Sequence, residues 1–133
     1  MTPTVLSSGV NDIRSILTEL NEQGGFNISI LTDVQGLPIA SASRDGVDPE
    51  QHSANVAIMQ KSISQLVNRL GMKETDEISI FDSAGQRLVC RPIQVNSHSL
   101  ILAVIVPDKR KAYRKVLNHS VTQIRRVWSQ YWS

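Results

Sequence analysis

Two segments of the sequence share a pattern that limits the possible folds. Residues 28–41 read ISILTDVQGLPIAS, and residues 78–90 read ISIFDSAGQRLVC. In each, a short apolar run leads through Asp-x-x-Gly into a second run, which is typical of paired strands joined by a tight turn. The aspartate can cap such a turn with its side chain, and the glycine can supply a positive φ. The chain therefore has to accommodate two similar strand–turn–strand units.

Apolar residues at helical spacing predict a helix before the first unit and another at the end of the chain. The first spans about residues 6–22 and ends at two glycines. Its apolar stripe consists of Leu6, Val10, Ile13, Leu17 and Leu20. The last is expected to open at Pro107-Asp108. Its stripe consists of Tyr113, Leu117, Val121, Ile124, Trp128 and Tyr131, with Val116 and Val127 beside it.

A third helix is predicted between the two units. Asp48 suits its N-cap, Pro49 its first position and Gln51 the capping-box position, and Gly71 ends it. The expected core stripe consists of Val56, Met59, Ile63, Leu66 and Leu70. The opposite side carries small, apolar and polar residues together, which is not the composition of a purely solvated face. These residues are Ala54, Ile58, Lys61 and Gln65.

Five strands complete the element order α-β-β-α-β-β-β-α. They are expected at residues 26–32, 37–42, 77–81, 86–93 and 99–106. Short connections favour antiparallel pairing. Pro38 cannot donate to a ladder, so the second strand is expected at an edge. The last strand is apolar on both faces, which predicts layers on both sides of the sheet. The sequence therefore predicts a single α+β domain over residues 1–133.

Composition agrees with one soluble domain, because 41% of the residues are hydrophobic and 20% are charged. The longest apolar run, residues 100–106, is too short to cross a bilayer, and residues 1–10 do not resemble a signal peptide. We therefore expect a cytoplasmic protein. Cys90 is the only cysteine, so no internal disulfide can form, and its strand-like surroundings predict a buried thiol.

The distribution of charge is uneven. Residues 1–108 carry seven basic and twelve acidic residues, whereas residues 109–133 carry seven basic residues and no acid. The seven are Lys109, Arg110, Lys111, Arg114, Lys115, Arg125 and Arg126. Two interpretations stay open. The cations form either the solvated side of an amphipathic helix or a face that binds an acidic partner, an anionic membrane or nucleic acid.

No motif for nucleotide, metal or enzyme chemistry is found in the sequence. Asp-x-x-G occurs in small GTPases, but no phosphate-binding glycine loop accompanies it here, so Asp33 and Gly36 are predicted to shape a turn. His52, His98 and His119 lack the spacing of metal ligands. Asp76 and Glu77 flank an expected edge strand, where solvated charges prevent aggregation. We expect no catalytic residue, no cofactor and no metal.

The element order and the segment LTDVQGLPIAS resemble the Roadblock/dynein light chain family. Further matching features are the alanine-containing central helix, the strand ISIF followed by Asp-x-x-Gly, and the closing strand LILAVIV. The resemblance implies a five-stranded antiparallel sheet with the second helix on one face and the first and third helices on the other. These motifs are turns and core positions, which specify a fold better than an activity.

The resemblance also implies function. Members of the family pair as homo- or heterodimers through the second helix and the third strand. The implied dimer interface here consists of Ala54, Ile58, Lys61, Gln65, Ile78 and Ile80. Such dimers are platforms for small Ras-like GTPases, and the bacterial regulators reshape the GTPase's own loops without supplying a catalytic arginine. The expected function is therefore a non-enzymatic, homodimeric GTPase regulator or scaffold. The alternatives are an anionic-surface binder and an assembly adaptor acting through the basic closing helix.

Overall fold

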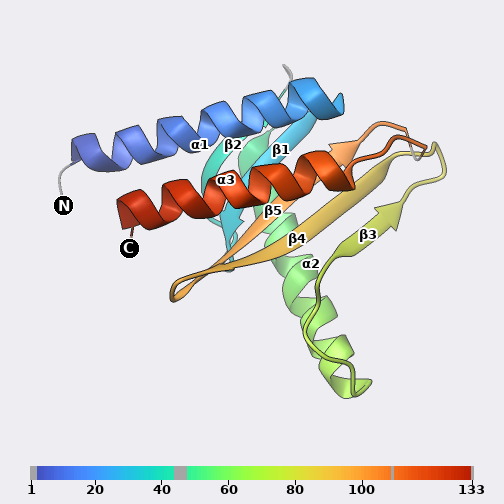
Figure 1. Cartoon of the computed structure of the whole chain (residues 1–133). Coiled ribbons are helices and arrows are strands. Elements are labelled where there is room, and N and C mark those ends of the chain that lie inside the picture. Colours follow the sequence, from blue (N-terminus) through green and yellow to red (C-terminus); the bar gives the residue numbers. More distant parts are fainter. Residues whose placement is uncertain (1–2, 44–47, 109, 133) are drawn as a thin grey trace.

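A computed structural model describes residues 3–43, 48–108 and 110–132 (Figure 1). It contains the predicted order of three helices and five strands. The helices are α1 (Pro3–Gly24), α2 (Pro49–Arg69) and α3 (Arg114–Trp132). The strands are β1 (Ile28–Asp33), β2 (Pro38–Ser43), β3 (Ile78–Phe81), β4 (Arg87–Val95) and β5 (His98–Val106). No helix among these described residues is long and apolar enough to cross a membrane.

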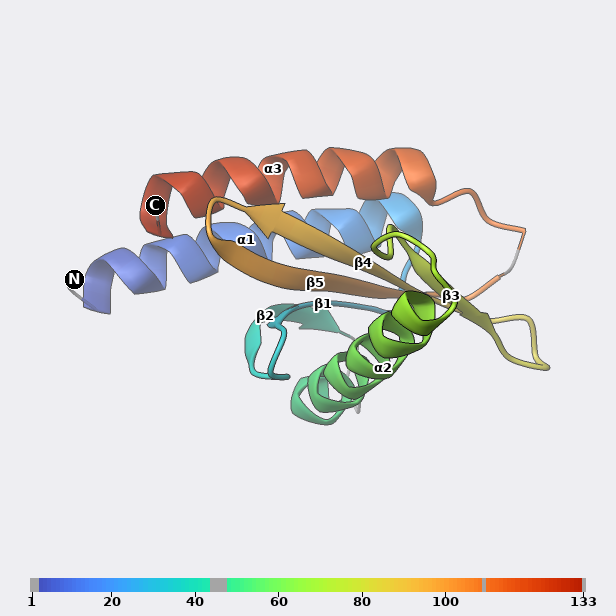
Figure 2. The ribbon, with the colours of Figure 1, turned by 90° about the horizontal axis from the view of Figure 1, so that it is seen from below.

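The five strands form one antiparallel sheet in the order β2-β1-β5-β4-β3. Helices α1 and α3 lie side by side on one face, and α2 crosses the other (Figures 1 and 2). Strand β5 is central, which explains its apolar residues on both faces. Pro38 begins edge strand β2, as predicted, and β3 forms the opposite edge. These placements confirm the predicted α+β fold and its layers.

The larger core lies between the sheet and the α1–α3 pair. Ile13, Leu17 and Leu20 of α1 are buried there, as predicted, and so are Tyr113, directly before α3, and the α3 residues Leu117, Val121, Ile124 and Trp128. The side chain of Leu6 lies outside the described part of the chain. The two helices approach closely at Gly9, where an added Cβ would lie 2.5 Å from the ring of Trp132. Tyr131 Oη also donates to Asp12 Oδ2 over 3.0 Å.

Both Asp-x-x-Gly segments form the predicted turns. Asp33 Oδ1 accepts from the backbone N–H groups of Gln35 and Leu37, and Asp82 Oδ1 accepts from those of Ala84 and Gln86. The glycines have φ values of 93° and 89°. Asp33 therefore uses its carboxylate to hold its own turn. The prediction that this stretch is a hairpin turn is confirmed.

The prediction for the core side of α2 is partly wrong. Leu66 and Leu70 are 51% and 65% exposed, although the sequence placed them in the core stripe. The buried residues of α2 are Ser53, Val56, Ala57 and Gln60, so the packed side is rotated and uses small and polar residues. The last turns of α2 project away from the sheet (Figure 1), which leaves their apolar side chains without a surface to cover.

The start of the last helix is also corrected. Pro107 and Asp108 precede a turn, and α3 begins only at Arg114. The Asp108 side chain accepts from the N–H of Arg110 at 2.9 Å, and its carbonyl accepts from the N–H of Lys111 at 3.0 Å. An Asp side chain that caps a turn offers the backbone an alternative to helix formation. Arg110 and Lys111 therefore lie before the helix, and Lys109 lies outside the described residues.

Candidate functional site

The predicted interface residues fall on one side of the molecule, with one exception. Ala54, Ile58, Lys61 and Gln65 are all exposed on α2, and Ile80 is exposed on β3. Ile78 is buried in the small core with Val56 and Cys90, so its side chain is not available for a partner. Ile80 shares the face of Ile78, because strand side chains alternate, but its side chain is 46% exposed. Of Ile78, only the backbone is accessible, at the outer edge of β3.

Exposed apolar side chains concentrate around this face. Among the described residues, the large hydrophobic side chains that are exposed are Val34, Leu37, Ile58, Leu66, Leu70, Met72, Ile80 and Phe81. Six lie on α2, on the connection that follows it or on β3. The other two lie in or beside the β1–β2 turn. This turn packs against α2, because a Cβ added at Gly36 would lie 3.2 Å from Ala54 Cα. None of these eight lies on α1 or α3. Such a concentration is characteristic of an interaction surface.

Sequence reasoning assigned only two of these eight residues, Ile58 and Ile80, to an interface. It placed Leu66 and Leu70 in the core stripe because their spacing from Val56 is helical. It gave no interface role to Val34, Leu37, Met72 or Phe81. The available signal was that α2 carries apolar residues on more than one side, as Ile58 and Leu66 show. A helix with apolar residues on more than one side carries more apolar surface than one face of a sheet covers.

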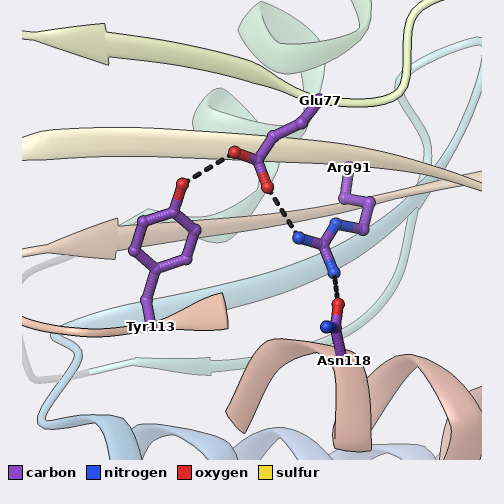
Figure 3. A network of polar contacts seen from close by, with 4 residues as sticks. All are labelled: Glu77, Arg91, Tyr113 and Asn118. Atoms are coloured by element: carbon purple, nitrogen blue, oxygen red, sulfur yellow. Dashed lines mark hydrogen bonds and ion pairs between the residues drawn. The ribbon is translucent and has the colours of Figure 1, made fainter. Parts of the chain in front are cut away.

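A polar network was also missed (Figure 3). Arg91 Nη2 donates to Glu77 Oε1 over 2.6 Å, and Tyr113 Oη donates to Glu77 Oε2 over 2.7 Å. Arg91 Nη1 also donates to Asn118 Oδ1. The side chains of Arg91 and Glu77 are only 15% and 16% exposed. Glu77 is therefore a partly buried structural carboxylate, and the prediction that it is a solvated charge at the strand edge is wrong.

The network controls the ionisation of Glu77. Partial burial favours the neutral acid and raises its pKa, but the hydrogen bonds from Tyr113 and Arg91 and the charges of Arg91 and Arg114 outweigh that effect. The resulting pKa of Glu77 lies below its usual value. The sequence held one signal for this arrangement: Arg91 is in phase with Val89 and Ile93, which face the large core. A charged residue on a core face requires a partner.

A groove of about 1140 Å³ opens beside this network. It lies where β4 continues beyond Ile78, the first residue of β3. Helix α3 and the C-terminal half of α2 border it. The lining residues are Ile63 and Val67 of α2, residues 72–79, Arg91 and Pro92 of β4, and Arg114, Asn118, Val121, Thr122 and Arg125 of α3. Pro92 is tolerated here because this edge of β4 has no neighbouring strand that would require its N–H.

The predicted basic face is not one face of a helix. Arg110 and Lys111 are exposed on the turn before α3, and Arg114, Lys115, Arg125 and Arg126 are exposed on α3 itself. Of these, Arg114 and Arg125 line the groove, whereas their neighbours Lys115 and Arg126 do not. The structure therefore divides these cations between the groove and the surrounding surface.

Other candidate groups do not converge on a chemical site. Cys90 is buried, as predicted, and burial raises the pKa of its thiol to about 12. His98 stacks edge-on against Trp128 at a centroid distance of 5.3 Å, and the Nδ1 of His52 lies 2.9 Å from the carbonyl of Asp48. Within the described ranges, no group of three His, Cys, Asp or Glu side chains is placed to hold a metal ion.

Comparison with solved structures gives clear matches, although no protein-family model and no curated protein matches the sequence. Myxococcus xanthus MglB is similar with a TM-score of 0.79 and 18% identity, over 93% of this chain and 92% of that one. The gliding protein MglB from Thermus thermophilus has a TM-score of 0.74 and 13% identity, over 92% of each chain.

A third match comes from a domain named for the fold. The Roadblock/LC7 domain from Streptomyces avermitilis has a TM-score of 0.71 and 14% identity, over 90% of this chain and 97% of that one. At these identities the likeness establishes architecture, and it agrees with the helix and strand placements above. The chain therefore has the Roadblock fold, in the form shared with the bacterial MglB proteins.

Proposed function

We propose that this chain is a non-enzymatic, homodimeric regulator or scaffold that acts in the cytoplasm on a small Ras-like GTPase and modulates its nucleotide cycle. The observation that carries the proposal is the concentration of exposed apolar side chains on α2, β3 and the adjoining turn, in a chain with the Roadblock fold. The role of Roadblock dimers as GTPase platforms comes from the family resemblance of the sequence.

Two exposed surfaces on the same side of the molecule support the proposed dimer. Strand β3 is a four-residue edge strand whose outer backbone groups have no partner among the described residues. A second copy can pair its own β3 there and continue the sheet. The exposed side of α2 then meets the same helix of the mate, where Ala54 permits close approach and Ile58 supplies apolar area. A two-fold arrangement uses the same patch twice.

Regulation by this protein would act through shape. The candidate surfaces present apolar and basic side chains and no assembled nucleophile, base or metal site within the described residues. A dimer can still alter nucleotide turnover by binding one conformation of the GTPase loops more tightly than another. The effect is limited by that difference in affinity, so binding is expected to depend on the bound nucleotide.

Affinity capture tests this proposal. The purified chain is used as bait in an extract of its source cells, with either a non-hydrolysable GTP analogue or GDP present. We expect a small GTPase to be recovered more strongly with one nucleotide, and an Ile58→Asp bait to recover much less of it. Recovery of no GTPase with either nucleotide by a bait that is folded and dimeric would contradict the proposal.

A second candidate function is binding to an anionic surface, because the described cations between residues 110 and 126 are all exposed. Sedimentation with phosphatidylserine vesicles, and gel shifts with generic DNA, across a salt series test this alternative. Electrostatic binding has to weaken as salt screens the charges. Absence of binding even at low salt eliminates it.

A further inference from the structure

The groove beside β4 has one wall made almost entirely of hydrogen-bond donors. Arg114, Asn118, Thr122 and Arg125 of α3 all line it, at spacings that place them along one side of the helix. Asn118 Oδ1 is occupied by Arg91, which leaves its amide N–H₂ group as the free end. Thr122 Oγ1 donates to the carbonyl of Asn118. The wall therefore offers guanidinium and amide donors, which suit a ligand that carries hydrogen-bond acceptors.

Neither outer cation of this wall forms an ion pair within the described residues. The partly buried Glu77, whose pKa the charge of Arg114 helps to lower, already accepts from Arg91 and Tyr113. Arg125 Nε donates over 3.3 Å to the carbonyl of Gln94, which leaves both of its terminal nitrogens available. No described carboxylate lies within ion-pair distance of Arg114 or Arg125. Arg114 and Arg125 are eleven positions apart, which corresponds to about 16 Å along a helix.

The rest of the groove limits the kind of ligand. Pro92, Ile63 and Val67 supply partly exposed apolar surface in the groove. Lys73, Glu74 and Asp76 also line it, and the two carboxylates would repel an extended polyanion or a flat anionic membrane. A groove that combines exposed cations, carboxylates and some apolar surface fits a narrow segment that carries a few carboxylates and some apolar side chains.

We propose that this groove binds an acidic amphipathic segment of a partner protein, whose carboxylates meet Arg114 and Arg125 and whose apolar side chains cover Ile63, Val67 and Pro92. The inference does not depend on the proposed GTPase function. Of the six implied dimer residues, only Ile78 also lines the groove. Met72 and Ser79, close to the α2–β3 face, line the groove as well. The groove is therefore a second interaction site that adjoins the α2–β3 face, and its α3 cations lie outside that face.

Fluorescence anisotropy with a defined peptide tests the proposal on the full chain. The probe is a fluorescein-labelled helical peptide of about 15 residues, long enough to carry carboxylates about 16 Å apart. It has leucine on one side and glutamate on the other, and a control peptide has every glutamate replaced by glutamine. We expect saturable binding of the acidic peptide and at least about tenfold weaker binding of the control, a difference of about 1.4 kcal/mol.

Adjacent cations on α3 provide matched variants. Arg114→Glu/Arg125→Glu is expected to raise the Kd for the acidic peptide by about tenfold or more. Lys115→Glu/Arg126→Glu makes the same change in net charge on the same helix, away from the groove, and is expected to change the Kd by less than about threefold. Arg114→Gln/Arg125→Gln provides a milder second pair, and circular dichroism verifies that each variant is folded.

Three results would overturn the proposal. The first is that the wild-type chain does not bind the acidic peptide. The second is that the groove pair and the outer pair of substitutions weaken peptide binding equally. The third is that the chain binds phosphatidylserine vesicles or a DNA oligonucleotide more tightly than the peptide, through Arg114 and Arg125. An NMR titration gives an independent readout. The side-chain N–H signals of Asn118 and Arg125 are expected to shift with the acidic peptide, and unchanged signals at saturation would place the binding elsewhere.

Discussion

Gly36 and Gly85 hold the same position in two turns with the same aspartate cap, but only Gly36 is packed. An added Cβ would lie 3.2 Å from Ala54 Cα at Gly36, and would meet nothing within 4 Å at Gly85. Both positions have positive φ, which disfavours alanine by about 1–2 kcal/mol. Crowding against the backbone of α2 adds a further penalty at Gly36 alone.

Gly36→Ala is therefore expected to lower the free energy of unfolding by about 1 kcal/mol more than Gly85→Ala, because only the first variant also forces α2 away from the turn. Urea denaturation followed by circular dichroism measures both. Equal losses in the two variants would mean that the turn is not held against α2.

Glu77 provides a test through pH. Its pKa is lowered in the folded chain, so its ionised form favours folding at pH values above the ordinary value of 4.5. That contribution is lost as pH falls through the lowered pKa. Glu77→Gln is expected to destabilise the protein at neutral pH, and the difference in unfolding free energy from wild type should shrink below pH 4.5. A difference that is constant from neutral to acid pH would contradict the network.

Cys90 tests the core beneath α2. Its thiol is fully buried, and burial raises its pKa to about 12, so little thiolate is present and reagents cannot reach it. Iodoacetamide at mildly alkaline pH is expected to label the native chain far more slowly than the urea-unfolded chain, as followed by mass spectrometry. Similar rates in the two states would show that α2 does not cover this part of the sheet.

At the scale of elements, Gly9 sets the distance between α1 and α3. An added Cβ would meet the ring of Trp132 at 2.5 Å, so Gly9→Ala forces the two helices or the ring to move. Overpacking of this kind costs about 1–3 kcal/mol. We expect such a loss in thermal or urea unfolding, and a much smaller one when the same change is made in a Trp132→Leu background. Equal losses in the two backgrounds would show that the ring is not the obstacle.

The elements also show what sequence patterns can and cannot predict. Periodicity located every helix and strand, and turn chemistry located the Asp33 and Asp82 turns correctly. Periodicity wrongly assigned Leu66 and Leu70 to the core. Spacing shows which residues share a side of a helix, but it does not show how far the sheet extends beneath that side. It placed the start of the last helix too early because Asp108 suits both a helix N-cap and the isolated turn that it forms.

At the scale of the whole molecule, order of elements predicted the fold, but not the groove. The groove combines Ile63 of α2, residues 72–79, Arg91 of β4 and Arg125 of α3. They are brought together only by the sheet order and by the late start of β3, which begins opposite Cys90. The same holds for Glu77, which meets Tyr113 across 36 positions of sequence. The core-facing position of Arg91 indicates that it needs a partner, but pairings over such distances leave no local pattern that identifies the partner.

The central claim is that two copies of the chain join through α2 and β3 to build the surface on which a partner docks. Light scattering with size-exclusion chromatography at micromolar concentration tests it most directly. We predict twice the chain mass of 14.8 kDa for wild type and a folded monomer for Ile58→Asp, since an unpaired charge buried at an interface costs about 3–5 kcal/mol. His119→Asp, on exposed α3 surface, is expected to remain dimeric. A wild-type chain that elutes with the mass of one copy would contradict the account.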